Sequence, residues 1–382
     1  ACVTVADTVR ALGDLARFNR RRGPLSVLAV TGSNGKTSTR LLLERVVGQR
    51  FTPLATTGNL NNHIGLPLTL FRLAPAHQAA VLELGMNHAG EIHYLGGICE
   101  PDVGVITNVG PAHLEGLGSL ENVARAKGEL IDTIRADGTA ILNADDPMVA
   151  ALGRRADCSV VYFGTGHRAQ VRAENIEPAE AGITFRLTTP SGSLPITLAT
   201  PARVMVANAL AAAACGEVLG IPLERIKSGL EAFVPQAGRM GIRVLERGIR
   251  LMDDTYNANP ASMKAAIETL ARMRRRHRAI AVLGDMLELG SQSAALHRQV
   301  GRAVGEHRID RLYATGQFAD AVADGARDAG MPEERIICAS KPVLTERLTA
   351  QLEAGDLLLV KGSRGMAMET VVSAICAWAQ DE

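Results

Sequence analysis

Short apolar runs alternate with amphipathic stretches along the first part of the chain. Runs typical of buried strands lie at residues 25–30, 79–84, 103–107 and 140–143, and helical patterns separate them. Strands that alternate with helices predict a parallel α/β sheet. A further helical pattern occupies residues 1–22 and ends at a Gly-Pro break, Gly23 and Pro24.

The pattern changes between residues 158 and 198. Short β-rich runs at 160–163, 183–187 and 196–198 are separated by glycine and proline, which predicts an antiparallel appendage to the sheet. An alanine-rich helix is expected at 206–219. A second α/β rhythm follows, with strand patterns at 249–252, 280–283, 311–314, 336–338 and 357–360.

Composition removes several classes of protein. The 382 residues are too many for one ordinary domain, and 41 basic against 40 acidic residues leave a net charge of +1. Such a balance argues against a nucleic-acid-coating role. No apolar run approaches the ~18–20 residues that span a bilayer, so we expect no membrane insertion. The six cysteines form no CxxC pair, which favours a reduced, cytoplasmic protein.

The strongest chemical signal follows the first apolar strand. Its residues are typical of a phosphate-binding loop that opens a helix: Gly32, Ser33, Asn34, Gly35, Lys36, Thr37 and Ser38. Glycines let backbone N–H groups face phosphates, Lys36 can reach the β/γ-phosphates, and the Thr37 hydroxyl can ligate Mg²⁺. The general pattern has glycine where Val30 stands. A strand-to-helix turn without a ligand is therefore the alternative.

The segment from Thr31 to Thr37 resembles the short ATP loop of the Mur ligase family, which lacks the same glycine. The resemblance implies an ATP- and Mg²⁺-dependent amide ligase, in which ATP phosphorylates a carboxylate and an amine attacks the acyl phosphate. It also implies a central phosphate-loop ATPase domain over 23–236 and a Rossmann-like C-terminal domain over 237–382. Residues 1–22 would be a remnant of an N-terminal UDP-binding domain. ATP would lie between the two large domains, with a hinge at 235–241.

Three further residues match the metal and catalytic positions of the family. Glu83 follows a buried strand, where a carboxylate is costly unless it is paired or bound to metal, and the resemblance makes it a Mg²⁺ ligand. His113 matches a metal-proximal histidine. Lys127 matches a lysine whose carbamate holds a second Mg²⁺, and it is one of only six lysines. The alternatives are a capping Glu83 and a surface Lys127 on an amphipathic helix.

The resemblance extends to the rest of the ATP site. Asn208 matches a residue near adenine, and Arg239 an arginine directed at the γ-phosphate, which completes the expected catalytic set with Lys36, His113 and Lys127. Asp254 can bind ribose hydroxyls from a strand end, and Asn257 lies in the same motif. The family usually has Gly and His where Ala202 and Val204 stand, so the adenine pocket is expected to differ locally.

The remaining motifs concern the substrates. The segments YNANP, LGDMLELG and VKGSRGMAME are most similar to family members that add D-alanyl-D-alanine to UDP-N-acetylmuramoyl-tripeptide. The Asp-Asn-Pro-Arg motif of the diaminopimelate-adding members is absent. We expect a monomer that uses these two substrates, and the third residue of the tripeptide stays open. The implied substrate residues are Thr57, Asn59, Asn61, Asn62, Asn259, Lys361, Ser363 and Arg364.

Three alternative functions stay open at this stage. One is another ligase of the family, of the folylpolyglutamate or cyanophycin type. The second is a non-catalytic nucleotide-binding accessory protein. The third is a phosphate-loop switch or motor ATPase, which would hydrolyse ATP without an acceptor.

Overall fold

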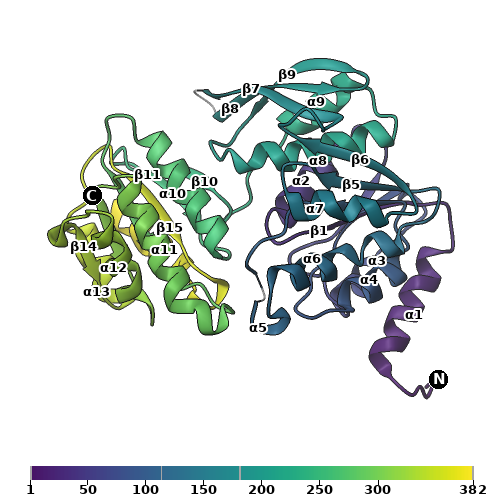
Figure 1. Cartoon of the computed structure of the whole chain (residues 1–382), viewed down its shortest axis with the longest axis horizontal. Coiled ribbons are helices and arrows are strands. Elements are labelled where there is room, and N and C mark those ends of the chain that lie inside the picture. Colours follow the sequence, from purple (N-terminus) through teal and green to yellow (C-terminus); the bar gives the residue numbers. More distant parts are fainter. Residues whose placement is uncertain (1, 113, 180–181, 381–382) are drawn as a thin grey trace. The chain divides into compact units, whose positions relative to one another are not determined.

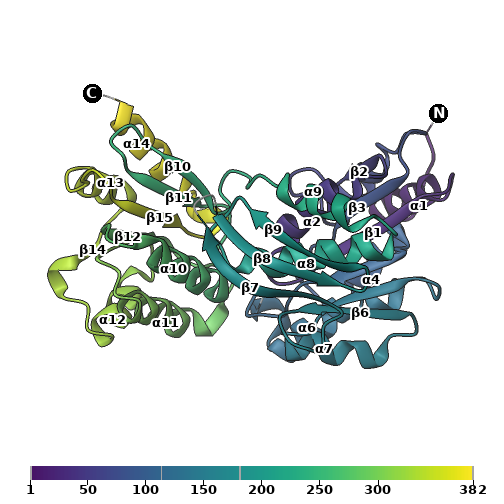
Figure 2. The ribbon, with the colours of Figure 1, turned by 90° about the horizontal axis from the view of Figure 1, so that it is seen from above.

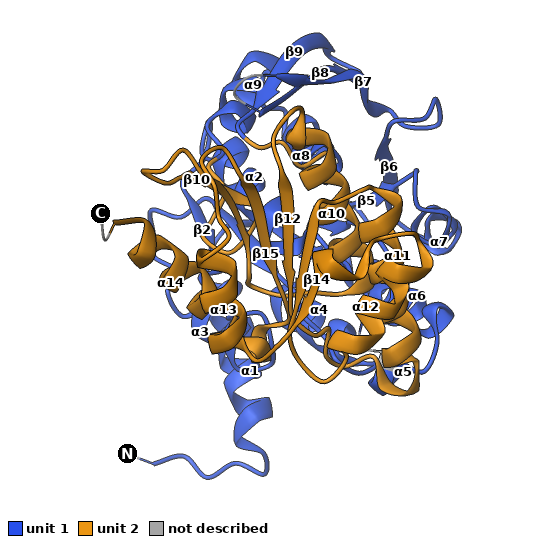
Figure 3. Cartoon of the chain, turned by 90° about the vertical axis from the view of Figure 1, so that its left-hand side faces the viewer, with its two compact units in different colours: residues 1–199, 204–233 blue, residues 200–203, 234–382 orange. Residues whose placement is uncertain are grey.

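Two sheets organise the chain, one in each of two units (Figures 1 and 3). The computed structural model describes residues 2–112, 114–179 and 182–380. The first unit comprises residues 1–199 and 204–233, and the second comprises residues 200–203 and 234–382.

The first unit is an α/β structure, as the alternating apolar and amphipathic stretches predicted. Its strands are β1 (Ser26–Thr31), β2 (Pro53–Ala55), β3 (Ala79–Glu83), β4 (Val103–Ile106), β5 (Thr139–Asn143), β6 (Ser159–Gly164), β7 (Val171–Ala179), β8 (Gly182–Thr189) and β9 (Gly192–Leu198). Its helices are α1 (Thr8–Arg20), α2 (Lys36–Val47), α3 (Gly65–Leu70), α4 (Glu91–Cys99), α5 (Leu114–Leu117), α6 (Leu120–Gly128), α7 (Pro147–Leu152), α8 (Val204–Val218) and α9 (Leu223–Glu231). Short 3₁₀ turns lie at Ile131–Thr133 and Gly153–Arg155.

Among the described residues, the first sheet has nine strands in the order β2-β3-β1-β4-β5-β6-β7-β8-β9. The strands from β2 to β7 pair in parallel, and β7, β8 and β9 form an antiparallel extension (Figure 2). The prediction for residues 160–163 was therefore wrong in one respect. This run is β6, and it pairs in parallel with β5. A short β-rich run does not reveal the direction of its neighbour, because that depends on how the chain returns.

Helices cover both faces of the first sheet. Along β1, Val27 and Ala29 join the apolar cluster that contains side chains of α3, α4 and α6, whereas Leu28 and Val30 point to the opposite face. On that opposite side, α2, α8 and α9 contact one another. Burial on both faces explains why β1 is apolar throughout.

Helix α1 packs on α3 and α4 of the first unit (Figure 1). Asp7 caps its first turn by accepting N–H bonds from Val9 and Arg10 at 2.8 and 3.0 Å. At the other end, the buried Arg20 guanidinium donates to the carbonyl oxygen of Cys99 at 2.9 Å. The predicted helix within residues 1–22 is thus present and anchored.

The second unit is a smaller α/β layer structure. Its strands are β10 (Gly241–Val244), β11 (Arg250–Asp254), β12 (Ala279–Leu283), β13 (Arg311–Ala314), β14 (Ile336–Cys338) and β15 (Leu357–Lys361). Its helices are α10 (Pro260–Arg274), α11 (Ser293–Glu306), α12 (Ala319–Asp328), α13 (Lys341–Thr349) and α14 (Glu369–Gln380). Short 3₁₀ turns lie at Gly290–Gln292, Glu333–Arg335 and Arg364–Met366.

Six described strands form the second sheet in the order β10-β11-β15-β12-β13-β14, and only β10 runs antiparallel. Alternate side chains enter two cores. Met252, Ala281 and Leu359 face α10 and α11, while Leu251, Val282 and Leu358 face α13 and α14. Because these strands run parallel to one another, the polar residues that follow them lie at one edge of the sheet. Within the described residues, no helix is both long and apolar enough to cross a membrane.

Candidate active site

The phosphate loop lies between β1 and α2, at the carboxyl edge of the first sheet. Gly35 has φ +80°, the left-handed region that favours glycine, and it occupies the N-cap position of α2. A Cβ on Gly35 would lie 2.3 Å from Oδ1 of Asn208. A Cβ on Gly32 would lie 1.9 Å from Oγ1 of Thr107. Both glycines are therefore required by the close approach of neighbouring side chains.

The loop that follows β4 anchors the phosphate loop. The backbone N–H of Asn34 donates to Oδ1 of Asn108 at 2.8 Å, and its carbonyl oxygen accepts from Oγ1 of Thr107 at 2.6 Å and from Nδ2 of Asn108 at 3.0 Å. Ser33 bonds to Gly110 on the same loop. Sequence reasoning did not assign roles to Thr107 and Asn108. The signal was their polarity immediately after a buried strand.

Lys36 begins α2 and folds back over the phosphate loop. Its ammonium donates to the carbonyl oxygen of Gly32 at 2.8 Å. The first N–H groups of α2 lie at the same loop, where a helix N-terminus favours an anion. Ser38 follows in the first turn and is half-buried. This arrangement has the components of a triphosphate-binding loop.

Glu83 joins the phosphate loop to a second polar loop. Its side chain is 3% exposed at the end of β3. Oε2 accepts a hydrogen bond from Oγ1 of Thr37 at 2.8 Å, and Oε1 accepts one from Nδ2 of Asn61 at 2.8 Å. The carboxylate does not cap the following turn. Instead, Thr37 and Glu83 bring two oxygen donors together, the ligand type that Mg²⁺ prefers.

Lys127 is 1% exposed, although it lies near the end of an amphipathic helix, α6. The surface-lysine alternative is therefore wrong. Burial shifts the pKa of Lys127 well below its usual value, and the charge of Lys36 lowers it further. No ion pair to Lys127 occurs among the residues that the structure describes. A buried amine in this setting favours the neutral form.

His113, the remaining residue predicted at the metal site, lies outside the described residues. Within the described part of the chain, no group of three or more His, Cys, Asp and Glu side chains could hold a metal by itself. A magnesium ion here would therefore need ligands besides these side chains, and phosphate oxygens of a nucleotide are the natural supply.

Asn208 lies on α8, buried beside Gly35. Its Nδ2 lies 3.3 Å from Sδ of Met205. Val204, one of the positions that departs from the family pattern, is 52% exposed, whereas Ala202 is buried. The structure thus brings Asn208 to the phosphate loop of the first unit.

In the second unit, Lys361 joins two strand ends. Its ammonium is 2% exposed and donates to Oδ2 of Asp254 at 2.6 Å and to the carbonyl oxygen of Asn257 at 2.8 Å. The Arg239 guanidinium lies 3.9 Å above the Tyr256 ring, and the Tyr256 N–H donates to the carbonyl oxygen of Gly238. These contacts place Arg239 near the loop that follows β11.

The predicted substrate residues fall into several environments. Thr57 and Asn59 are exposed, and Thr57 accepts a hydrogen bond from Arg72. Asn62 accepts N–H bonds at the start of α3, and Asn259 caps α10. Ser363 and Arg364 lie on the loop after β15. Ser363 is buried, whereas Arg364 is exposed and pairs with Glu369 at 2.8 Å.

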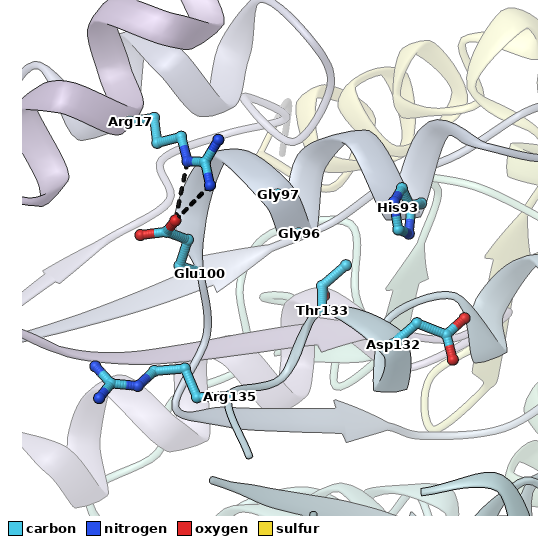
Figure 4. Close-up of a pocket in the computed structure, with 8 residues that line it drawn as sticks. All are labelled: Arg17, His93, Gly96, Gly97, Glu100, Asp132, Thr133 and Arg135. Atoms are coloured by element: carbon cyan, nitrogen blue, oxygen red, sulfur yellow. Dashed lines mark hydrogen bonds and ion pairs between the residues drawn. The ribbon is translucent and has the colours of Figure 1, made fainter. Parts of the chain in front are cut away.

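A separate pocket lies at the amino edge of the first sheet (Figure 4). Glu100 and Arg135 line it, and they stand close to the first residues of β4 and β5. The phosphate loop follows the carboxyl end of β1, which is the opposite edge of a parallel sheet. Arg17 pairs with Glu100 at 2.7 Å, as Figure 4 shows. The pocket is therefore separate from the candidate active site, and this charged pair is already satisfied internally.

Family models match both units of the chain. The Mur ligase middle domain matches residues 30–216, and the Mur ligase, glutamate ligase domain matches residues 238–364. The chain is 40% identical over 378 residues to the UDP-N-acetylmuramoyl-tripeptide–D-alanyl-D-alanine ligase of Escherichia coli (strain K12), covering 97% of this chain and 81% of the relative. The enzyme of the same name from Bacillus subtilis (strain 168) is 35% identical over 372 residues, with coverage of 97% and 80%.

Solved structures agree with the sequence relatives. MurF from Acinetobacter baumannii has a TM-score of 0.90 at 36% identity and covers 98% of this chain and 82% of that one. The MurF ligase from Thermotoga maritima in complex with ADP has a TM-score of 0.89 at 26% identity, with coverage of 99% and 86%. The chain belongs to the Mur ligase family. Within it, the similarity is to members named UDP-N-acetylmuramoyl-tripeptide–D-alanyl-D-alanine ligase.

Proposed function

We propose that this chain joins D-alanyl-D-alanine to UDP-N-acetylmuramoyl-tripeptide, with cleavage of ATP to ADP and phosphate, in peptidoglycan precursor synthesis. The observation that carries the proposal is a phosphate loop bonded through Thr37 to a buried Glu83, in a chain 40% identical to a ligase of that name. The reaction takes place in the cytoplasm, where cell-wall precursors and ATP are made.

The residues of the first unit fit ATP and Mg²⁺. Gly35 leaves the N-terminus of α2 open to phosphate, and Lys36 lies across the loop with its ammonium on a carbonyl oxygen that a phosphate oxygen can replace. Thr37 and Glu83 would hold the metal together with phosphate oxygens. When bound, Mg²⁺ neutralises charge on the phosphates and acts as a Lewis acid.

The reaction proceeds in two steps, a phosphoryl transfer and an acyl transfer. An oxygen of the tripeptide's terminal carboxylate attacks the γ-phosphorus, and the bond to ADP breaks. The amine of D-alanyl-D-alanine then attacks the carbonyl carbon of the acyl phosphate, a C–N bond forms, the amine loses a proton, and phosphate leaves. Lys36 and Arg239 stabilise the negative charge that develops on transferring oxygens.

Lys127 is proposed to act as a carbamate. Its neutral amine attacks the carbon of CO₂, one N–H proton passes to solvent, and an anionic carbamate forms. Burial favours this step because it lowers the pKa of the amine. The product would place a carboxylate-like group where the sequence has a lysine, close enough to Lys36 for their charges to interact. His113 is proposed to stand near the same metal.

In this proposal, each unit supplies residues that bind different parts of the substrates. Asn208 on α8 is assigned to the adenine side of ATP, and Asp254 with Asn257 to its ribose. Thr57, Asn59, Asn61 and Asn62 would contact the UDP-sugar peptide from the loop beside Glu83, because Asn61 already bonds that carboxylate. The loops that carry Asn259, Lys361, Ser363 and Arg364 would then bind the amine substrate.

The test is ADP release by the purified chain in four mixtures: ATP alone, ATP with either substrate, and ATP with both. The proposal expects release only when UDP-N-acetylmuramoyl-tripeptide and D-alanyl-D-alanine are both present. Lys36→Ala should lower turnover by at least ~10²–10³, comparable to the loss of one preorganised donor. Lys264→Ala, a change at the exposed lysine that bonds Gln299, is the matched control.

The same assay separates the alternative functions. ADP release without any acceptor indicates a switch or motor ATPase. Release in an added mixture of ATP, a folate and glutamate indicates a folylpolyglutamate-type ligase. Nucleotide binding without turnover in any mixture indicates an accessory protein.

A further inference from the structure

The second unit contains a buried histidine, His297, to which the sequence analysis gave no role. His297 on α11 is 0% exposed. Its Nδ1 lies 2.7 Å from the carbonyl oxygen of Ser293, and its Nε2 accepts the backbone N–H of Met286 at 2.9 Å. A carbonyl oxygen requires a donor and an N–H requires an acceptor, so these partners select the neutral Nδ1–H tautomer. Both ring nitrogens are therefore committed to backbone groups.

The segment that His297 holds is the loop after β12. Within it, the Asp285 carboxylate accepts N–H bonds from Gln317 at 2.6 Å and Phe318 at 3.1 Å. Gly316 has φ +119°, and a Cβ there would lie 2.3 Å from the Asp285 carboxyl carbon. The Phe318 ring stacks on His297 with centroids 4.7 Å apart. The loops after β12 and β13 thus close on each other around this histidine.

The same loop is tied to the predicted substrate residues. Oγ of Ser363 accepts the N–H of Leu287 at 2.9 Å and lies 3.3 Å from the carbonyl oxygen of Ala258. The Ser363 N–H donates to the carbonyl oxygen of Asp285 at 2.9 Å. Four loops at the carboxyl edge of the second sheet, those after β11, β12, β13 and β15, are thereby joined.

We propose that His297 is a positioning residue for the amine substrate, because its bond to Met286 fixes the loop that in turn holds Ser363. The inference rests on the proposed function, in which these loops bind D-alanyl-D-alanine. A dipeptide has few groups to recognise, so its affinity depends on loops that are held in place before it binds. Burial lowers the pKa of His297, and the Asp285 carboxylate, 3.8 Å from Nε2, opposes this. The net direction keeps the ring neutral.

Two substitutions separate the two hydrogen bonds of His297. Asparagine can offer an N–H near the position of Nδ1 but no acceptor for Met286. Glutamine can offer a carbonyl oxygen near the position of Nε2 but loses the donor to Ser293. The proposal therefore expects His297→Asn to raise the KM for D-alanyl-D-alanine about tenfold, because a buried N–H is left unsatisfied. His297→Gln should stay within about threefold of the parent chain.

The KM for ATP and the KM for UDP-N-acetylmuramoyl-tripeptide are the internal controls, and both should be unchanged. Equal dipeptide KM values in the parent and His297→Asn would overturn the proposal. Equal increases of this KM in the Asn and Gln variants would also overturn it. A fall in kcat with unchanged KM values would overturn it as well, because it indicates only a smaller fraction of folded enzyme. If the parent chain itself shows no dipeptide-dependent ADP release, the proposed function fails instead.

Hydrogen exchange on the parent chain keeps the test independent of how the variants fold. The Met286 N–H is expected to be protected to the same degree as the amides of β12. Exchange of the Met286 amide at the rate of an exposed loop, with β12 protected, would show that His297 does not hold this loop and would reject the proposal.

Discussion

Lys127 shows how burial changes the chemistry of one residue. A free lysine has a pKa of ≈ 10.4, so its neutral form is scarce at neutral pH. In this chain the side chain is 1% exposed and its pKa lies well below the usual value, through burial first and the Lys36 charge second. The neutral amine that carbamate formation needs is therefore favoured.

The prediction at this residue is that Lys127→Arg abolishes ligation although it keeps the positive charge, because a guanidinium forms no carbamate with CO₂. Lys127→Ala should also be inactive, and added acetate or formate should restore part of the turnover. The matched control is Lys227→Arg at a half-buried lysine that bonds the carbonyl oxygen of Pro195 and pairs with Glu231. It should leave activity unchanged.

A second measurement at Lys127 does not depend on turnover. Carbon NMR of the chain with ¹³C-labelled bicarbonate and Mg²⁺ should show a carbamate signal that is absent from Lys127→Arg. A fully active Lys127→Arg chain, or the lack of any Lys127-dependent signal, would return Lys127 to a structural role.

Charged residues of the site were identified from the sequence, whereas two uncharged polar residues and a histidine bonded to the backbone were missed. Glu83 was assigned because a carboxylate that follows a buried strand needs a special reason, and Lys127 because it matches a family motif in a chain with only six lysines. Thr107 and Asn108 were not assigned, since uncharged polar residues after a strand are common. His297 was not found either, because its hydrogen-bond partners are backbone groups and an amphipathic helix predicts nothing about them.

The phosphate loop is the decisive element of the first unit. Its shape depends on Gly35 in the left-handed region and on the contact between this glycine and Asn208. The loop after β4 adds hydrogen bonds to Asn34 from the other side. Contacts within the protein therefore hold this element in place, which limits the entropy lost on binding.

We expect Gly35→Ala to weaken ATP binding and to lower the stability of the fold. A non-glycine residue in the left-handed region costs about 1–2 kcal/mol, and the new Cβ would collide with Asn208, 2.3 Å away. Calorimetric titration with ATP and thermal unfolding measure the two effects. Each kcal/mol should lower Tm by about 2–4 °C in a unit of this size.

Gly97→Ala is the matched control for this change. Gly97 lies within α4, and in the described part of the chain a Cβ there would meet nothing within 4 Å. Alanine should stabilise the helix by about 0.5–1 kcal/mol and leave ATP binding unchanged. If both variants bind ATP like the parent, the close approach at Gly35 is not needed for nucleotide binding.

At the level of elements, most strands of both sheets were predicted, including the three-residue edge strand β14, whereas β2, β7 and β10 were not. β2 and β10 have three and four residues and contain no long apolar run, and charged residues interrupt the pattern of β7. β6 was predicted as a strand but with the wrong direction, because its pairing with β5 is decided by the crossover through α7. Apolar periodicity identifies a strand, whereas its partner depends on the whole sheet.

The whole molecule combines two α/β units, and the polar residues of each collect at the carboxyl edge of its sheet. In the first unit these are the phosphate loop, Glu83 and Asn61; in the second they are Asp254, Lys361 and Ser363. Both units match domains of the Mur ligase family. The proposed reaction uses both sets, the first for phosphoryl transfer and the second for the amine.

The decisive experiment for the ligase activity of this chain is the rate of ADP release as a function of both substrates together. With saturating ATP and Mg²⁺, we predict a rate near zero with UDP-N-acetylmuramoyl-tripeptide alone or D-alanyl-D-alanine alone. With both, ADP should appear in equal amount to the UDP-linked pentapeptide, which mass spectrometry quantifies. ADP release that is independent of the dipeptide, or release without a pentapeptide product, would contradict the assignment of this chain as the ligase.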